Sequence, residues 1–124
     1  MSESLRTLLV AGSRSLETMD PAQLEHILSN ASYIFDCTID RVIHGAARGI
    51  DTMAAQWATK RGKIVDAFPA EWDRLGRSAG YQRNHTMVKE CDMGIVVWDR
   101  SSQGSLHTYN LLLASGKPTV LVLP

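Results

Sequence analysis

Short apolar runs alternate with longer amphipathic segments along nearly the whole chain, and this alternation constrains the fold more than any other feature. Each apolar run is long enough for one strand, and the spacing between runs leaves room for one helix. The runs predict five strands, at residues 8–11, 41–44, 64–68, 94–98 and 119–123. Strands that alternate with helices in this way are typical of βαβ units and a parallel sheet.

The segments between the strands carry helix start and stop signals. Asp20 suits an N-cap with Pro21 after it, and Gly62 and Gly116 suit the ends of later helices. Four helices are expected, starting at Pro21 and Ile50 and spanning residues 79–90 and roughly 105–115, with a long loop over residues 69–78. Right-handed crossovers place such helices on both faces of a sheet. We therefore expect an α/β fold, a Rossmann-like three-layer sandwich around a five-stranded, mostly parallel sheet.

Length and composition predict a single domain over residues 1–124. The 124 residues are 44% apolar and 21% charged, which is close to an ordinary globular domain. Lysine and arginine number 13, as do aspartate and glutamate, so the net charge is zero. This balance argues against binding nucleic acid through bulk positive charge, and nucleic acid is not expected as a partner.

The cysteines and the N-terminus indicate the cellular compartment in which the protein is expected. Cys37 and Cys91 stand far apart and fit no metal-ligand spacing, so we predict no metal site and interpret both as buried residues in a reducing compartment. Residues 1–4 lack the basic region of a signal peptide, and no apolar stretch approaches the ~20 residues that cross a bilayer. The expectation is a cytoplasmic protein with no membrane partner.

Three glycine-containing loops follow predicted strands, at the edge of a parallel sheet where ligands bind. The first is Gly12-Ser13-Arg14-Ser15. Glycine lets backbone amides approach an anion, and arginine donates two parallel hydrogen bonds to a phosphate. The alternative is a tight strand exit with an exposed arginine.

The second loop joins a strand directly to a helix and is more specific. It runs from His44 through Gly45, Arg48 and Gly49 to Asp51. The free amides and the dipole at a helix N-terminus attract anions, and Arg48 adds a further donor. Asp51 falls in the first helical turn, where helix capping is the alternative to a ligand role. His44 can equally be a satisfied histidine at a strand end.

The segment from Trp72 to Asn84 supplies a base-binding candidate and a cation. Trp72 lies in a predicted loop and is the best placed of the three tryptophans to stack on a base. Arg83 lies four residues before Met87 on one helical face, which favours a position toward the sheet over a solvated one. Gly80, near a helix start, indicates a close approach of the backbone to another group.

The loop of residues 99–105 follows the buried strand at residues 94–98. Its hydroxyl groups and its glycine precede a helix, which suits phosphate binding. The candidates there are Asp99, Gly104 and Ser105. The alternative is an ordinary loop in which Ser105 is the N-cap of the helix.

Four stretches of the chain resemble the SLOG superfamily, most closely its YspA-like branch. They are AGSRS, VIHGAARGIDTMAAQWA, FPAEWDRLGRSAGYQRNHTM and CDMGIVVWD. The resemblance covers nearly the whole chain. It implies a Rossmann-like SLOG domain that senses or processes a nucleotide, NAD or an ADP-ribose derivative. Members of the superfamily often dimerise through helices, so a homodimer is an open alternative to a monomer.

The superfamily includes the LOG phosphoribohydrolases, which cleave the N-glycosidic bond of nucleoside monophosphates with an arginine and a glutamate. Arg83 and Met87 match the arginine segment of that pattern, and Gly104 and Ser105 match its Gly-Thr pair. Thr108 holds the glutamate position, which speaks against LOG-type catalysis because an oxocarbenium-like transition state favours a nearby negative charge. Hydrolysis would need another carboxylate, from Asp51, Asp99 or Glu71. The candidate catalytic residues are Asp51, Arg83 and Asp99.

The expected function is binding or sensing of a nucleotide or nucleotide-derived ligand, with no cofactor required. The expected ligand site comprises Gly12, Ser13, Arg14, His44, Gly45, Arg48, Gly49, Trp72, Asn84, Gly104, Ser105 and Thr108. One alternative is a nucleotide N-glycosidase or phosphoribohydrolase with a carboxylate other than the missing glutamate. A second is single-stranded nucleic-acid binding of the DprA type, to which the segment GAARGID is similar, although the balanced charge disfavours it. Whether the chain is an enzyme is left open.

Overall fold

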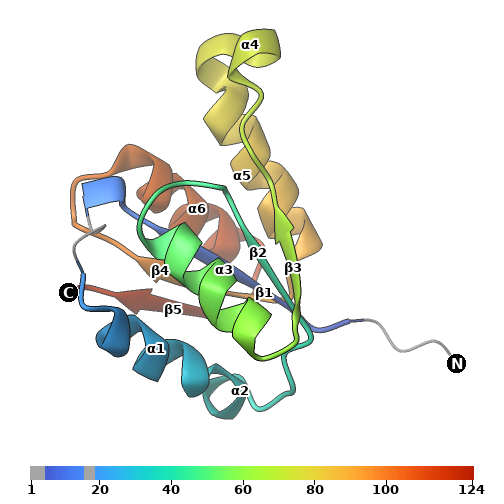
Figure 1. The fold of residues 1–124 in the computed structure, drawn as a ribbon. Helices are drawn as coiled ribbons and strands as arrows, with labels where there is room; N and C mark the ends of the chain where they lie inside the picture. Colours follow the sequence, from blue (N-terminus) through green and yellow to red (C-terminus); the bar gives the residue numbers. More distant parts are fainter. Residues whose placement is uncertain (1–4, 16–18) are drawn as a thin grey trace, which may run out of the picture.

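Five strands form one sheet at the centre of the computed structural model, which describes residues 5–15 and 19–124 (Figure 1). Their bounds are β1 (Thr7–Gly12), β2 (Arg41–His44), β3 (Ile64–Ala67), β4 (Met93–Val97) and β5 (Thr119–Val122). The strand order is β3-β2-β1-β4-β5, and each neighbouring pair within the described residues is parallel. The α/β, Rossmann-like prediction is confirmed, with a sheet that is wholly rather than mostly parallel. Residues 1–4, on which the expectation about a signal peptide rests, lie outside the described residues.

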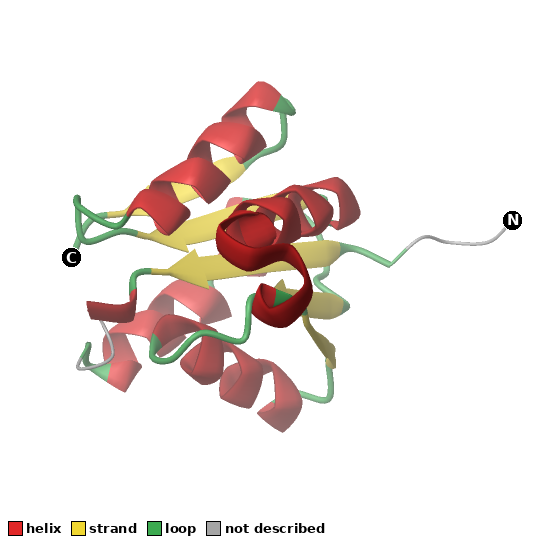
Figure 2. Cartoon of the chain, turned by 90° about the horizontal axis from the view of Figure 1, so that it is seen from above, coloured by secondary structure: helices red, strands yellow, loops and turns green. Residues whose placement is uncertain are grey.

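Helices cover both faces of the sheet, as Figure 2 shows from above. Helices α1 (Pro21–Ser29) and α3 (Ile50–Lys60) pack together on one face, and α5 (Ala79–Glu90) and α6 (Gln103–Ala114) pack together on the other. In the described part of the chain, no helix is long and apolar enough to cross a membrane.

The alternation of side chains along β1 explains why both faces are covered. Leu8 and Val10 belong to the core that contains α1 and α3, whereas Leu9 and Ala11 belong to the core that contains α5 and α6. Successive strand residues point to opposite faces. Residues 8–11 of β1 are apolar on both faces, so the strand must be buried on both sides, as a central parallel strand is.

The predicted loop of residues 69–78 is partly helical, which corrects that expectation. It contains the one-turn helix α4 (Trp72–Leu75) and the 3₁₀ helix η2 (Gly76–Ser78), so Trp72 begins a helix rather than lying in a loop. A single turn is too short to show apolar periodicity, and this one is held locally by an ion pair between Arg74 and Glu71. Another one-turn helix, α2 (Ala31–Ile34), follows α1.

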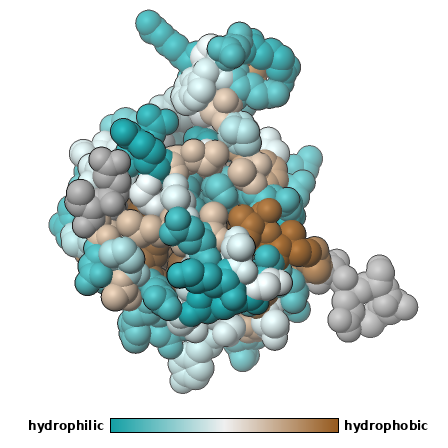
Figure 3. Space-filling view, viewed as in Figure 1, coloured by the Kyte–Doolittle hydropathy of each residue, from teal (hydrophilic) through white to brown (hydrophobic). Residues whose placement is uncertain are grey.

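Helix α4 projects beyond the sheet at the end of α5, and the space-filling view shows largely hydrophilic residues over this projecting end (Figures 1 and 3). In the described residues its contacts are mainly with η2 and α5. Trp72 of α4 and Arg77 of η2 line the cavity at the carboxyl ends of the strands, which is described next.

Two features set the positions of the helices that start at this edge. Helix α6 begins at Gln103, and its N-cap is Ser102 rather than the Ser105 considered from the sequence, because the Ser102 hydroxyl accepts a hydrogen bond from the Ser105 N–H at 3.4 Å. Helix α3 begins against the end of β1, where a Cβ on Gly12 would come within 3.0 Å of Ile50. Glycine at position 12 therefore allows the start of α3 to approach the strand.

Candidate functional site

A cavity of about 560 Å³ lies at the carboxyl ends of β1 and β4, beside α5 and the start of α6. The strand order reverses between β1 and β4, because β2 and β3 extend the sheet on one side and β4 and β5 on the other. Such a switch point is the usual ligand site of an open parallel sheet. The volume is within the range of small-molecule sites.

Arg83 is a cation of the cavity that protein hydrogen bonds hold in place. Its Nε donates to the Asn84 Oδ1 at 2.9 Å, and its Nη1 donates to the carbonyl oxygens of Gly45 at 2.5 Å and Phe68 at 3.3 Å. Burial lowers the pKa of Arg83, the charge of Asp51 raises it, and the charge of Arg14 lowers it further. The guanidinium is thus fixed on the sheet side, as its spacing from Met87 predicts.

Asp51 lies at the start of α3 and is only 3% exposed. Its Oδ2 accepts from the backbone N–H groups of Gly45 at 2.8 Å and Ala47 at 3.2 Å. No described residue hydrogen-bonds to its buried Oδ1. Burial raises the pKa of Asp51 to about 6, although the N–H groups of Ala47 and Gly45 and the charge of Arg83 oppose this rise. The carboxyl therefore changes charge close to neutral pH.

Asp99 is the second carboxylate at the cavity and has the opposite electrostatics. Its Oδ2 accepts from the Ser15 hydroxyl at 2.5 Å, and its Oδ1 accepts from the backbone N–H groups of Ser101 at 2.9 Å and Ser102 at 2.8 Å. These hydrogen bonds hold the pKa of Asp99 well below its usual range. Both oxygens are therefore engaged in joining the β4–α6 loop to the loop after β1.

The start of α6 faces the cavity through small side chains. Gly104, Ser105 and Thr108 line the cavity, and a Cβ on Gly104 would meet no atom within 4 Å. The Thr108 hydroxyl donates to the Gly104 carbonyl at 3.2 Å. Residues in the first turn of a helix carry N–H groups that no helical carbonyl can accept, so this end of α6 offers donors to an anion.

Asn84 connects Arg83 to α6. Its Nδ2 lies 3.3 Å from the Gly104 carbonyl oxygen and 3.1 Å from the Nδ1 of His107, while its Oδ1 accepts from Arg83. Asn84 is 4% exposed. Each polar atom of its amide therefore has a protein partner, and the side chain holds two walls of the cavity together.

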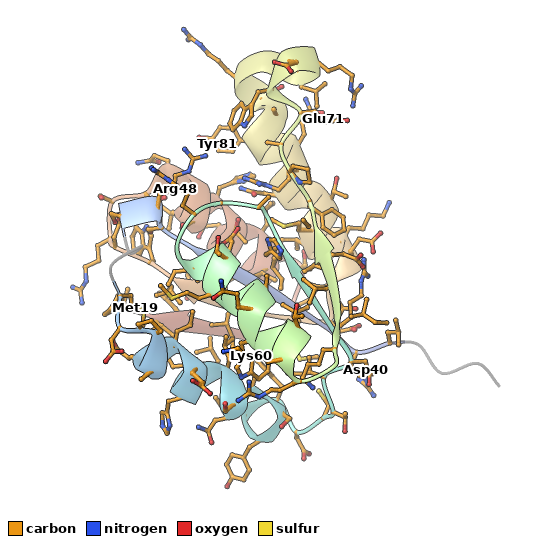
Figure 4. All side chains as sticks on the ribbon, in the orientation of Figure 1. Met19, Asp40, Arg48, Lys60, Glu71 and Tyr81 are labelled. Carbon is orange, nitrogen blue, oxygen red and sulfur yellow. The ribbon has the colours of Figure 1, made fainter. Side chains whose placement is uncertain are left out.

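Two aromatic side chains line the cavity near the projecting end. Trp72 is 52% exposed, and its ring lies so close to Gly80 that a Cβ there would come to 3.2 Å. Tyr81, labelled in Figure 4, is 47% exposed and meets the ring of His107 edge-on at 4.7 Å between centroids. Both rings therefore line the cavity and are also partly exposed to solvent.

The structure brings most of the residues predicted for the site to this cavity. Those that line it are Gly12, Arg14, Gly45, Asp51, Trp72, Arg83, Asn84, Asp99, Gly104, Ser105 and Thr108. Their separations in sequence are large, but the parallel strands end at the same edge of the sheet. The expectation that the strand-end loops converge therefore agrees with the geometry.

Four predicted residues are not among those that line the cavity. Ser13 is buried and accepts from the Asp99 N–H at 3.1 Å, and the Nδ1 of His44 accepts from the Ala46 N–H at 3.0 Å, so both satisfy the loops internally. Gly49 has φ of 76° at the N-cap of α3. Arg48 is exposed on the same loop (Figure 4).

Three residues at or next to the cavity were not predicted from the sequence, namely Arg77, Tyr81 and His107. Arg77 and Tyr81 line the cavity, and they lie in the same stretch as Gly80 and Arg83, whose signals in the sequence are stronger. His107 contacts Asn84 across the α5–α6 interface, which no local pattern records. No group of three metal-binding side chains occurs among residues 5–15 and 19–124.

Comparison with protein families supports this assignment of the fold. The model of the YAcAr family, described as the YspA, cpYpsA-related SLOG family, matches residues 7–75. The chain belongs to this family. The matched segment of this YAcAr protein runs from β1 through α4 and contains the Gly12, Gly45 and Asp51 side of the cavity. Membership indicates a nucleotide-related function.

A solved structure supports the fold of the whole YAcAr chain. The X-ray structure of DNA processing protein A (DprA) from Streptococcus pneumoniae matches with a TM-score of 0.75 and 19% sequence identity. The match covers 97% of this chain and 51% of the DprA chain, so this chain spans about half of that protein. No curated protein sequence matches this YAcAr chain.

Proposed function

We propose that this YAcAr protein binds a nucleotide or nucleotide-derived ligand, such as a mononucleotide, NAD or ADP-ribose, in the cavity between β1 and β4. The observation that carries the proposal is that cations and exposed aromatic rings line one cavity of about 560 Å³. A nucleotide presents the matching pair of groups, an anionic phosphate and a flat base. Family membership supports the same class of ligand.

The phosphate is assigned to the side formed by Arg14, Arg83 and the start of α6. Arg83 is fixed by three oxygen acceptors, so little conformational entropy is lost when its guanidinium binds an anion. The N–H groups of Gly45 and Ala47 already donate hydrogen bonds to the carboxylate of Asp51. The start of α6 at Gly104 is therefore the better amide donor to phosphate.

The base is assigned to Trp72 and Tyr81. Stacking of a base on an aromatic ring contributes ~1–3 kcal/mol and tolerates different bases. Both rings are about half exposed and line the cavity, so each can contact a planar group there. Asp99 serves this site by fixing the loop that leads to α6, because both of its oxygens are engaged.

Thermal unfolding in the presence of AMP, NAD and ADP-ribose tests the proposal. A ligand at a hundred times its Kd stabilises the protein by ~2.7 kcal/mol. Adenosine and ribose 5-phosphate each supply half of the ligand, so each should stabilise less than AMP. If none of the three nucleotides raises the unfolding temperature, the proposal is contradicted. It is also contradicted if only a single-stranded oligonucleotide does so.

The variant Arg83→Gln gives the residue-level test. A hydrogen bond between charged groups contributes ~1.5–3 kcal/mol, so the Kd should rise about tenfold to a hundredfold. Arg6→Gln is the matched control, because Arg6 is an exposed arginine just before β1, at the other end of the strand from the cavity. Equal affinity of both variants for ADP-ribose would place the phosphate elsewhere.

Hydrolysis of the N-glycosidic bond is a second candidate function, and one observation favours it. Asp51 puts a buried carboxylate with a pKa of about 6 beside Arg83 in the cavity. In this reaction a water oxygen bonds to the anomeric carbon, the bond from carbon to base breaks, and the base leaves with a proton. A negative charge near the sugar stabilises the cationic transition state.

Release of free base from AMP or NAD, followed by chromatography, tests this second function. Hydrolysis through Asp51 requires that release stops in Asp51→Asn and continues in Thr108→Val. Absence of free base from the wild-type protein, together with nucleotide binding, leaves binding as the function.

A further inference from the structure

We propose that neutral His107 is a positioning residue which, through Asn84, holds Arg83 toward the cavity, so that protonation of His107 weakens ligand binding. This inference rests on the proposed nucleotide-binding function. His107 is half-buried on α6 and does not line the cavity itself. Its influence runs through a chain of hydrogen bonds that crosses from α6 to α5.

The orientation of the Asn84 amide is fixed by two of its partners. The Nε of Arg83 can only donate, so the Asn84 atom 2.9 Å from it must be the acceptor Oδ1. The Gly104 carbonyl can only accept, so the atom 3.3 Å from it must be the donor Nδ2. Rotating the amide by a half turn would place two donors together and two acceptors together.

This orientation dictates the state of the imidazole. The Asn84 Nδ2 lies 3.1 Å from the Nδ1 of His107, and this Nδ2 carries hydrogen atoms. The Nδ1 must therefore present a lone pair, which means that His107 is neutral and carries its proton on Nε2. A proton on Nδ1 would instead face the amide donor.

Protonation of His107 thus conflicts with the contacts that Asn84 makes. If Asn84 rotates to offer its oxygen to the imidazolium, it loses the acceptor for Arg83 and turns that oxygen toward the Gly104 carbonyl. If it does not rotate, two donors are held at hydrogen-bond distance. Either outcome disturbs the arginine and the start of α6, which are the two groups assigned to phosphate.

The surroundings of His107 keep it neutral near physiological pH. Burial lowers the pKa of His107, and the charge of His85 lowers it further. Among the described residues, three titratable or charged groups of α5 lie near it. They are His85, with its ring centroid at 5.3 Å, Tyr81 at 4.7 Å, and Arg83 beyond Asn84. Asp51, with a pKa of about 6, changes charge between pH 5.0 and pH 7.5, so the experiment must separate its effect from that of His107.

Nitrogen-15 NMR of the histidine side chains tests the protonation state without a ligand. The spectrum of His107 should show a neutral ring with the proton on Nε2 at pH 7.5 and a pKa below the ordinary value of ~6.5. In Asn84→Ala the preference for the Nε2 proton should weaken. A proton on Nδ1 in the wild-type protein would overturn the proposal.

Binding of ADP-ribose at pH 7.5 and pH 5.0 tests the coupling, because its pyrophosphate stays ionised over this range. The variant His107→Gln retains an acceptor for Asn84 but does not titrate, and His85→Gln is the control that leaves the Asn84 contact intact. The ratio of the Kd at pH 5.0 to the Kd at pH 7.5 should be at least about five times larger in the wild type and in His85→Gln than in His107→Gln.

The outcomes separate this inference from the proposed function. Equal loss of affinity in the wild type and in His107→Gln, with binding present at pH 7.5, overturns the role of His107 alone. No binding of ADP-ribose, AMP or NAD at either pH overturns the proposed function and this inference with it. The Asp51 titration is common to all three proteins and cancels in the comparison.

Discussion

The loops β2–α3 and β4–α6 both contain glycine and both use an aspartate to accept loop amides, yet the two carboxyls behave oppositely. Asp51 is buried, and its pKa rises to about 6. Asp99 accepts from two amides and a hydroxyl at a more exposed position, and its pKa lies well below the usual range. The hydrogen bonds are similar in kind, so burial decides the difference.

This difference also determines what each loop offers a ligand. In β2–α3 the N–H groups of Gly45 and Ala47 donate hydrogen bonds to Asp51, so these two amides are not available to a ligand. In β4–α6 the amides taken by Asp99 belong to Ser101 and Ser102, which precede the helix. The first turn of α6 is left facing the cavity. A glycine-rich turn before a helix is therefore not sufficient evidence for an anion site.

The largest expected effect is on the pH dependence of stability and compares Asp51→Asn with Asp99→Asn. The folded-state pKa of Asp51, about 6, exceeds the ordinary aspartate value of 3.8, so folding binds a proton between these values. Its contribution to stability is therefore present in acid and is lost as the pH rises through 6. The wild type should lose ~2–3 kcal/mol relative to Asp51→Asn between pH 4 and pH 7.5.

Chemical denaturation at several pH values measures this difference. In Asp99→Asn the profile between pH 4 and pH 7.5 should run parallel to that of the wild type, because Asp99 is ionised throughout this range. A wild-type profile parallel to that of Asp51→Asn would show that burial does not raise the pKa of Asp51.

The next effect compares the two glycines, in Gly45→Ala and Gly104→Ala. A Cβ on Gly45 would come within 3.0 Å of the Arg83 guanidinium, whereas one on Gly104 meets no atom within 4 Å. Gly45→Ala should cost ~1–3 kcal/mol in stability by forcing Arg83 to move, and should weaken ADP-ribose binding about tenfold. Gly104→Ala should gain up to ~1 kcal/mol, because alanine favours the helix.

Thermal unfolding and a binding titration measure both variants of this pair. If Gly45→Ala binds as tightly as the wild type, the position of Arg83 is not important for the ligand. If Gly104→Ala abolishes binding without loss of stability, the methyl group occupies ligand space at the start of α6.

The smallest effect concerns the helix caps of the two loops. Helix α6 has a side-chain cap from Ser102, whereas the N-cap residue of α3, Gly49, provides no side-chain cap. Ser102→Ala should lower the free energy of unfolding by ~1 kcal/mol. Ser101→Ala is the control, since Ser101 contributes a backbone N–H to Asp99, and its effect should stay within ~0.5 kcal/mol. Equal effects would mean that the cap does not stabilise α6.

The layers of the fold were predictable because they depend on local patterns. The bounds of β2 and α5 agree with the sequence analysis, since a short apolar run and a capped amphipathic segment each signal their own structure. Helix α4 was missed because one turn contains no repeat. Ser105 was considered as the N-cap of α6, but the cap lies at Ser102. Both residues are suitable caps, and only the backbone geometry distinguishes them.

The location of the cavity could be predicted from the sequence, but the electrostatics of its residues could not. The strand-end loops converge because parallel strands end at one edge, which the order of elements already indicates. The pKa of Asp51 depends on its burial, and the link from Asn84 to His107 depends on how α5 packs against α6. Contacts between helices far apart in sequence leave no mark in a local pattern.

The register between β1 and β4 has a consequence for how the protein folds. Leu8 of β1 lies opposite Met93 of β4, so the pairing of these neighbouring strands closes a loop that contains β2, α3, β3 and α5. Closing such a long loop slows folding, because its entropy is lost before the contacts form. The cavity lies at this junction. The protein should consequently become competent to bind its ligand only after β4 has paired with β1.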